Sequence, residues 1–199
     1  MEARKFKADF EIRQNDKGNV DKIIGYAAVT DSEAPEVMGF IEKIEPGAFE
    51  KAIGKSDVRA LFNHDSNYIL GRKSAGTLTL IEDENGLFYE IDPPNTSYAN
   101  DLLESLARGD IDESSFGFTV KEETWDDSGD IPVRTIVEVE ELYDVGPVTR
   151  GWYPQSESGL KSKSEVLQEF RNMKNDKNIK AKEELERYKY KIKSLKRCK

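Results

Sequence analysis

The chain contains a single histidine, His64, so any chemistry that needs an imidazole as general base must use this residue. His64 follows the apolar run at residues 58–62, and the hydroxyls of Ser114 and Ser115 follow about fifty residues later, where another apolar run begins. A serine hydroxyl is a weak nucleophile until a base removes its proton, and a neutral imidazole does this near pH 7. A serine and a histidine that can act as its base are the minimum set of catalytic side chains of a serine hydrolase.

The alternation of side chains along a strand decides which serine can meet His64. Phe116 and Phe118 share the face of Ser114. If both phenylalanines point into the core, Ser115 points to the opposite face, which suits a nucleophile at the surface. The alternative for either serine is a hydroxyl that satisfies backbone groups at a strand entry. The alternative for His64 is a residue of a surface turn.

The composition argues against several other kinds of site. Cys198 is the only cysteine, so it cannot form an internal disulfide, and a chain end is a poor place for a positioned nucleophile. Zinc sites built from histidine and cysteine need more of both residues. Asp126, Ser128 and Asp130 resemble a calcium loop without its later glutamate, so a polar hairpin tip is the better interpretation. We therefore expect no metal and no organic cofactor.

The apolar segments of the chain are short. None approaches the roughly 20 residues that a membrane-spanning helix needs, and the first residues lack the apolar centre of a secretory signal. We expect no membrane partner. The single cysteine agrees with a reducing cytoplasm.

Charge divides the chain into two parts. Residues 161–199 contain 14 lysines and arginines against six aspartates and glutamates, a net charge of +8, so the preceding part carries −17 of the total of −9. Serines and a glycine near residues 156–164 are typical of a linker. We predict a domain at 1–158 and a basic helical tail at 159–199. Beyond Tyr188 and Tyr190 the tail lacks the interleaved aromatic residues of a single-strand binder, so no specific nucleic acid is expected.

Hydrophobic periodicity predicts several strands and few helices before the linker. The expected strands lie at residues 6–12, 23–29, 58–62, 77–81, 87–91, 115–120 and 134–143. A short helix is expected to end near Ile53, and a longer one to run from Thr96 or Ser97 through Ala107. This pattern favours an α+β fold that is mainly antiparallel, with a closed barrel as one form.

Four pairs of short motifs occur in order along the chain. They are GYAAV at 25–29 with IEPGAF at 44–49, ALFNHD at 60–65 with ILGR at 69–72, RGDI at 108–111 with SSFGF at 114–118, and RTI at 134–136 with VGPVT at 145–149. In order and spacing this set resembles the prohead (capsid-maturation) protease family of tailed phages, distant relatives of the herpesvirus assemblin proteases. The resemblance implies a serine endopeptidase on an antiparallel β-barrel core surrounded by helices.

The resemblance also implies the catalytic residues. The family's histidine corresponds to His64, and its serine, immediately before Phe-Gly-Phe, to Ser115. Assemblins have a second histidine on the strand after the nucleophile; this chain has none, so an acid must serve there. Alignment from residues 134–136 selects Glu138, but one extra residue before Leu142 leaves Glu140 and Asp144 in competition.

The same resemblance leaves the donors for the oxyanion unassigned. Assemblins recruit an arginine from the loop after the third strand, whereas Arg150 is displaced in this chain. Backbone amides near Gly117 or Gly146 are equally plausible donors.

By the same resemblance, the protein acts inside the immature capsid, or prohead, in the host cytoplasm. It is expected to cleave the scaffolding region of the major capsid protein and then itself, and the assemblins suggest a homodimer by analogy. A first alternative is a catalytically silent scaffold or capsid-assembly module that docks through its basic tail. A second is a fused protease–scaffold, for which 199 residues leave little room.

Overall fold

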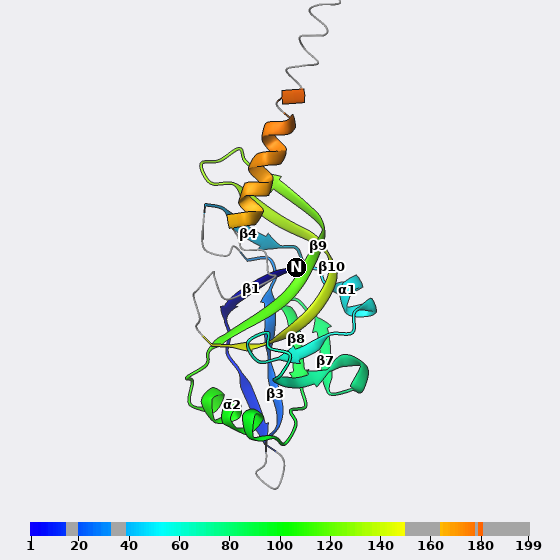
Figure 1. Ribbon diagram of the computed structural model, residues 1–199, viewed down its shortest axis with the longest axis vertical. Helices are drawn as coiled ribbons and strands as arrows, with labels where there is room; N and C mark the ends of the chain where they lie inside the picture. Colours follow the sequence, from blue (N-terminus) through cyan, green and yellow to red (C-terminus); the bar gives the residue numbers. More distant parts are fainter. Residues whose placement is uncertain (15–19, 33–38, 150–163, 178, 181–199) are drawn as a thin grey trace, which may run out of the picture. The chain divides into compact units, whose positions relative to one another are not determined.

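The computed structural model describes residues 1–14, 20–32, 39–149, 164–177 and 179–180 (Figure 1). The chain divides into two compact units, Met1–Lys161 and Ser162–Lys199. In the second unit, residues 164–177 are helical. The predicted linker at 156–164 lies almost entirely outside the described residues, as does the part of the predicted basic tail at 181–199.

The first unit is built from two β-sheets. The larger sheet has six strands in the order β1-β9-β10-β5-β6, with β4 also paired to β10. Its strands are β1 (Glu2–Lys7), β4 (Ile41–Ile44), β5 (Arg59–Leu61), β6 (Ile69–Arg72), β9 (Glu113–Asp126) and β10 (Val133–Val148). The smaller sheet has the order β2-β3-β8-β7 and consists of β2 (Glu11–Gln14), β3 (Val20–Val29), β7 (Leu78–Glu82) and β8 (Gly86–Ile91).

The predicted barrel is not closed. In the described part of the chain, the two sheets are separate ladders, and β4 and β5 pair with β10 in parallel. The predicted strand at 6–12 is also two strands, because the chain leaves the larger sheet after Lys7 and enters the smaller one at Glu11. The fold is therefore mixed α+β with mostly strands, as predicted, but without the predicted closure.

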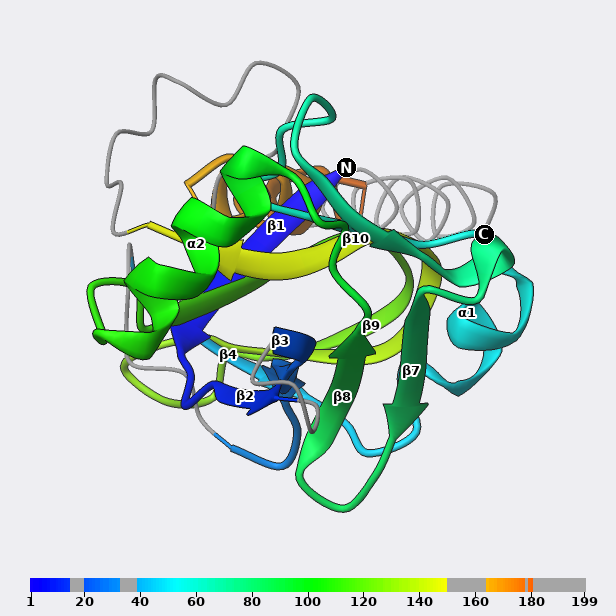
Figure 2. The ribbon, with the colours of Figure 1, turned by 90° about the horizontal axis from the view of Figure 1, so that it is seen from below.

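The helices are short. They are α1 (Glu50–Lys55), a 3₁₀ turn (Lys73–Ala75) and α2 (Ser97–Ala107) in the first unit. Figure 2 shows α1 and α2 at opposite sides of the strands, with the β7–β8 hairpin on the side of α1. Thr96 is the N-cap residue that precedes α2, but its hydroxyl makes no capping hydrogen bond. Four buried apolar residues attach α2 to the core: Ala99, Leu102, Leu103 and Leu106.

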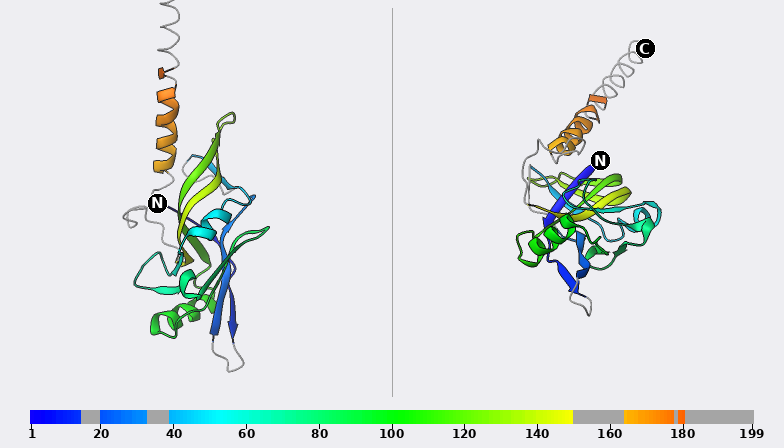
Figure 3. Two further views of the ribbon diagram at one scale, coloured as in Figure 1. Left: turned by 90° about the vertical axis from the view of Figure 1, so that its right-hand side faces the viewer. Right: turned by 60° about the horizontal axis from the view of Figure 1, so that its bottom comes forward.

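The strands β9 and β10 form one long, strongly twisted antiparallel ribbon (Figure 3). The inner faces of both sheets share one apolar cluster, in which Phe116 and Phe118 of β9 stack with ring centroids 4.6 Å apart. Phe49, just before α1, packs edge-on against Phe116 at 5.4 Å. Burial of each such ring stabilises the fold by about 1.5–3 kcal/mol, which fixes the face that β9 turns inward.

Candidate active site

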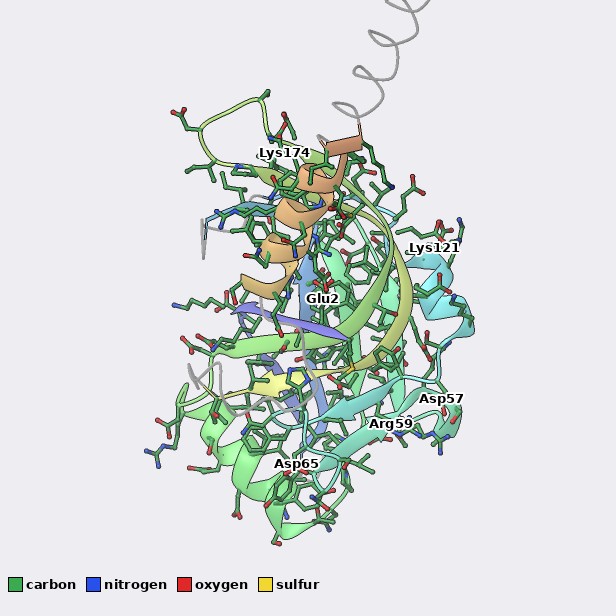
Figure 4. All side chains as sticks on the ribbon, turned by 45° about the horizontal axis from the view of Figure 1, so that its top comes forward. Glu2, Asp57, Arg59, Asp65, Lys121 and Lys174 are labelled. Atoms are coloured by element: carbon green, nitrogen blue, oxygen red, sulfur yellow. The ribbon has the colours of Figure 1, made fainter. Side chains whose placement is uncertain are left out.

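His64 lies in a tight turn that follows β5. Asn63 and His64 have φ angles of 56° and 57°, in the left-handed region, where asparagine and histidine are more tolerated than most residues. The Asn63 carbonyl Oδ1 accepts hydrogen bonds from the Thr149 main-chain N–H at 2.8 Å and from its hydroxyl at 3.2 Å. The Asn63 N–H donates to the Pro147 carbonyl at 3.1 Å. The end of β10 therefore holds this strained turn in place. Figure 4 shows Asp65, the residue after His64, beyond one end of β5.

Ser115 lies in β9 between two strands, opposite Lys5 of β1 and Gly146 of β10. Phe116 and Phe118, which follow Ser115 along β9, are buried in the core, and the Ser115 hydroxyl points to the other face, toward His64. The predicted orientation of Ser115 is therefore confirmed, but Ser115 is only 2% exposed, where a surface position was predicted.

Ser114 is fully buried on the core side. Its hydroxyl donates to the Gly146 carbonyl at 3.3 Å and lies 3.1 Å from the Tyr89 hydroxyl. Burial raises the pKa of Tyr89, while the hydrogen bond with Ser114 lowers it by less. Ser114 thus has the structural role that satisfies polar groups within the core.

Asp144 reaches His64 from β10 because a glycine leaves room for its carboxylate. Asp144 lies opposite Gly117 in the ladder. A Cβ atom at Gly117 would lie 3.1 Å from Oδ2 and 3.3 Å from Oδ1 of Asp144, so the carboxylate lies directly over the glycine. Two residues later, Gly146 has a φ of 151°, and a Cβ atom there would lie 2.2 Å from the Leu61 carbonyl oxygen. Gly146 therefore lets the main chains of β10 and β5 come close together, just before the turn that contains His64.

The three side chains form one continuous chain of hydrogen bonds. His64 Nδ1 lies 2.6 Å from Asp144 Oδ1, and His64 Nε2 lies 2.7 Å from Ser115 Oγ. An ionised carboxylate can only accept, so Nδ1 is the protonated nitrogen and Nε2 faces the serine hydroxyl. The side chains of His64 and Asp144 are 14% and 9% exposed, which protects the bonds from competing water. This arrangement can remove the serine proton and stabilise the resulting imidazolium.

Glu138, the carboxylate favoured by the sequence, lies elsewhere on β10. Its Oε2 accepts a hydrogen bond from Lys51 at 2.8 Å, and its Oε1 accepts one from Lys121 at 2.7 Å. The hydrogen bonds with Lys121 and Lys51 lower the pKa of Glu138 to about 2. Figure 4 shows Lys121 close to α1, the helix that contains Lys51. Glu140 is similarly bound by Lys55.

The choice of Glu138 as the partner of His64 is therefore corrected to Asp144, which the sequence had left in competition. The physical reason is irregular pairing. The β9–β10 ladder has four register shifts between Ile136 and Asp144, so a count from the start of β10 does not predict which residue faces His64. The available signal was the glycine of Phe-Gly-Phe, since a bare position in a strand leaves space for a side chain on the neighbouring strand.

Other sequence predictions about the site are not decided by these contacts. Arg150 lies outside the described residues, and main-chain donors near Gly117 or Gly146 stay a prediction. Among the described residues, no group of three or more histidine, cysteine, aspartate or glutamate side chains could hold a metal ion. Within the same residues, no helix is long and apolar enough to cross a membrane.

The chain was also compared with known proteins. The capsid assembly protease of bacteriophage T4 is a structural neighbour with 10% identity and a TM-score of 0.41; the match covers 74% of this chain and 99% of the T4 chain. Comparison with curated proteins gives no match. The model of the caudovirus prohead serine protease family matches residues 8–174, a range that contains His64, Ser115 and Asp144. The chain therefore belongs to the caudovirus prohead serine protease family, and it is a serine protease.

Proposed function

We propose that this protein is an endopeptidase in which Ser115 is the nucleophile, His64 the general base and acid, and Asp144 the orienting carboxylate. The observation that supports these roles best is the continuous chain of bonds, 2.7 Å from Ser115 to His64 and 2.6 Å from His64 to Asp144. Membership of a serine protease family identifies the peptide bond as the bond that is broken.

The reaction proceeds in two halves. Ser115 Oγ attacks the scissile carbonyl carbon while its proton passes to His64 Nε2, and Asp144 stabilises the imidazolium through Nδ1–H. His64 then gives that proton to the leaving amine, and an acyl ester remains on Ser115. In the second half, a water molecule attacks the ester carbonyl carbon while one of its protons passes to His64 Nε2. His64 then returns this proton to Ser115 Oγ, which releases the acid and restores the serine hydroxyl.

The proposed substrates are the scaffolding region of the major capsid protein and the protease itself, inside the prohead. The support is the family, which is one of prohead proteases. Two compact units, with a basic tail in the second, provide a separable segment for self-cleavage. Removal of internal protein makes room for DNA, and hydrolysis makes the maturation step irreversible under these conditions.

A comparison of two neighbouring serines tests this proposal. The full chain, Ser115→Ala and Ser114→Ala are incubated with and without the matching capsid protein, and intact masses are followed over time. We expect the wild type to shorten and Ser115→Ala to lose at least about 10⁴-fold in rate. Ser114→Ala, which removes only a buried structural hydroxyl, is the matched control and keeps its cleavage activity.

Labelling by a fluorophosphonate gives a second readout that needs no substrate. The wild type and Ser114→Ala should acquire one phosphonyl group, and Ser115→Ala none. If the wild type neither shortens nor becomes labelled, the silent scaffold becomes the better interpretation of the chain.

A further inference from the structure

The Ser115 hydroxyl has a second partner besides His64. Its Oγ lies 2.8 Å from the main-chain carbonyl oxygen of Arg4, on the neighbouring strand β1, as well as 2.7 Å from His64 Nε2. Ser115 is only 2% exposed, so water does not readily replace either partner. The nucleophile is therefore one link in a chain of four groups: the Arg4 carbonyl, Ser115, His64 and Asp144.

A count of protons shows in which protonation state of His64 every contact of this hydrogen-bonded series is a hydrogen bond. It contains three short contacts, and each needs one proton between its two heavy atoms. A neutral imidazole and the serine hydroxyl provide two protons, so one contact joins two acceptors. An imidazolium provides one more: Nδ1–H donates to Asp144, Nε2–H donates to Ser115, and the hydroxyl donates to the Arg4 carbonyl. The Arg4 carbonyl thus stabilises the charged form of His64, in which the base cannot accept the serine proton.

A buried network of charges fixes the strand that carries this carbonyl. The Arg4 side chain binds Glu42 of β4, with Nε 2.5 Å from Oε1, and Glu2 of its own strand at 2.7 Å. Arg134 of β10 binds Glu2 at 2.7 Å, Glu42 at 2.8 Å and Glu123 of β9. Burial opposes the charge of Arg134, but the hydrogen bond with Glu2 and the charges of Glu2, Glu42 and Glu123 raise its pKa overall.

This network makes β1 a fixed part of the site. Glu2, Arg4, Glu42 and Arg134 are all at most 9% exposed, and a charge left without its partner at such a depth is costly. A one-residue slip of β1 would separate these charges and would also move the Arg4 carbonyl away from Ser115. Although β1 is an edge strand, its register is therefore determined.

We propose that the main-chain carbonyl of Arg4 is a positioning group for the nucleophile: it accepts the Ser115 hydroxyl in the resting enzyme and competes with His64 for that proton. The inference rests on the proposed catalytic role of Ser115. Because Ser115 must give its proton to His64 as it attacks, the hydroxyl must stop donating to the Arg4 carbonyl before the reaction starts. Activity should therefore begin at a higher pH than the triad alone would set.

The charged groups around the triad come from several elements. Asp144 of β10 faces His64 directly, and Asp65 follows His64 in its own turn. On β1 and β9, Lys5 and Glu113 form an ion pair at 3.0 Å next to Ser115. These groups are unchanged in the variants below, so they do not contribute to the expected differences.

The experiment is an NMR titration of full-length protein with labelled histidine, in which His64 gives the only imidazole signals. In a triad without a second acceptor, the serine hydroxyl donates to the neutral imidazole and stabilises that form. Removal of the hydroxyl then raises the titration midpoint of His64. With the Arg4 carbonyl as acceptor, the hydroxyl stabilises the charged ring, so Ser115→Ala lowers the midpoint. A raised or unchanged midpoint in Ser115→Ala overturns the proposal.

A second variant acts on the carbonyl itself. An ester in place of the Arg4–Lys5 peptide bond, introduced by semisynthesis, weakens the Arg4 carbonyl as an acceptor; an ester at Phe6–Lys7 is the matched control. We expect the first ester to lower the His64 midpoint by about 0.5 pH unit and the control to leave it unchanged. In the pH profile of the fluorophosphonate labelling rate, the midpoint on the acid side should fall by the same amount.

If both esters titrate like the wild type, the Arg4 carbonyl is a passive contact and the proposal fails. Failure of the proposed function looks different: the wild type would not react with the fluorophosphonate at any pH, while the His64 titration would still be measurable.

Discussion

Two stretches of the same strand, β10, carry carboxylates with opposite surroundings. In the first stretch, Glu138 bridges Lys51 of α1 and Lys121 of β9. In the second, Asp144 is buried over Gly117 and bonded to His64. Both side chains are ionisable acids on one strand, yet only one meets an imidazole. The comparison shows that the register and the neighbouring strand decide the role of a carboxylate here, and that its spacing in the sequence does not.

The largest effect is expected for Asp144→Asn, which removes the charge and keeps the shape. The amide favours the wrong tautomer of His64 and does not stabilise the imidazolium, so kcat/KM should fall by about 10⁴-fold near neutral pH. Rates of self-cleavage and of fluorophosphonate labelling measure the loss. A fall in kcat/KM of less than tenfold would mean that Ser115 and His64 act as a dyad and that Asp144 does not contribute to catalysis.

An intermediate effect is expected for Gly117→Ala, which tests whether the bare position under Asp144 is necessary. The added methyl group lies 3.1 Å from Oδ2, so the carboxylate has to shift by some tenths of an ångström. Misplacement of an orienting group lowers activity by roughly 10- to 100-fold with little change in fold. Gly54→Ala in α1, where a Cβ atom meets nothing within 4 Å, is the control and should keep full activity. Equal activity of the two variants would contradict the steric explanation.

The smallest effect is expected for Glu138→Gln. Because Glu138 binds lysines and not His64, labelling and cleavage rates should stay within about twofold of the wild type. The expected stability change is a decrease in Tm of at most a few degrees near pH 7. A large loss of activity would restore Glu138 as a functional residue.

The same variant has a predictable dependence on pH. The pKa of Glu138 is lowered in the folded protein to about 2, from an ordinary value near 4.5 that holds in the unfolded chain. The ion pairs therefore stabilise the fold fully above pH of about 4.5, and their contribution disappears as the pH falls toward 2. The difference in Tm between wild type and Glu138→Gln should shrink across that interval in a series of thermal scans.

Local pattern was sufficient for the residues that alternate regularly. Alternation predicted that Ser115 faces away from Phe116 and Phe118, and both rings are buried in the core. The strands β7 and β8 and the helix α2 were also predicted, because hydrophobic periodicity is a local signal. These elements required no knowledge of distant pairing.

Pairing between distant strands was beyond the sequence. Because of the register shifts on β10, the position of Asp144 next to His64 could not be counted from the sequence. The parallel pairing of β4 and β5 with β10 has no local signature. The barrel was expected from the resemblance to the assemblins and from the number of strands. The break between β1 and β2, which sends two halves of one alternating segment to different sheets, likewise has no local signal. The charged network was missed too, since Glu2, Arg4 and Glu42 look like solvated residues until their strands meet.

The two glycines Gly117 of β9 and Gly146 of β10 set a condition on moving the proposed active site to another protein. Gly117 has no side chain that would occupy the space of the Asp144 carboxylate. Gly146 allows the main chain of β5, which leads into the turn with His64, to contact the main chain of β10. If only the serine, the histidine and the aspartate are grafted onto a new sheet, the three side chains are present but the hydrogen-bond distances between them are not reproduced. The portable unit of this site is three side chains together with two places where a side chain is missing.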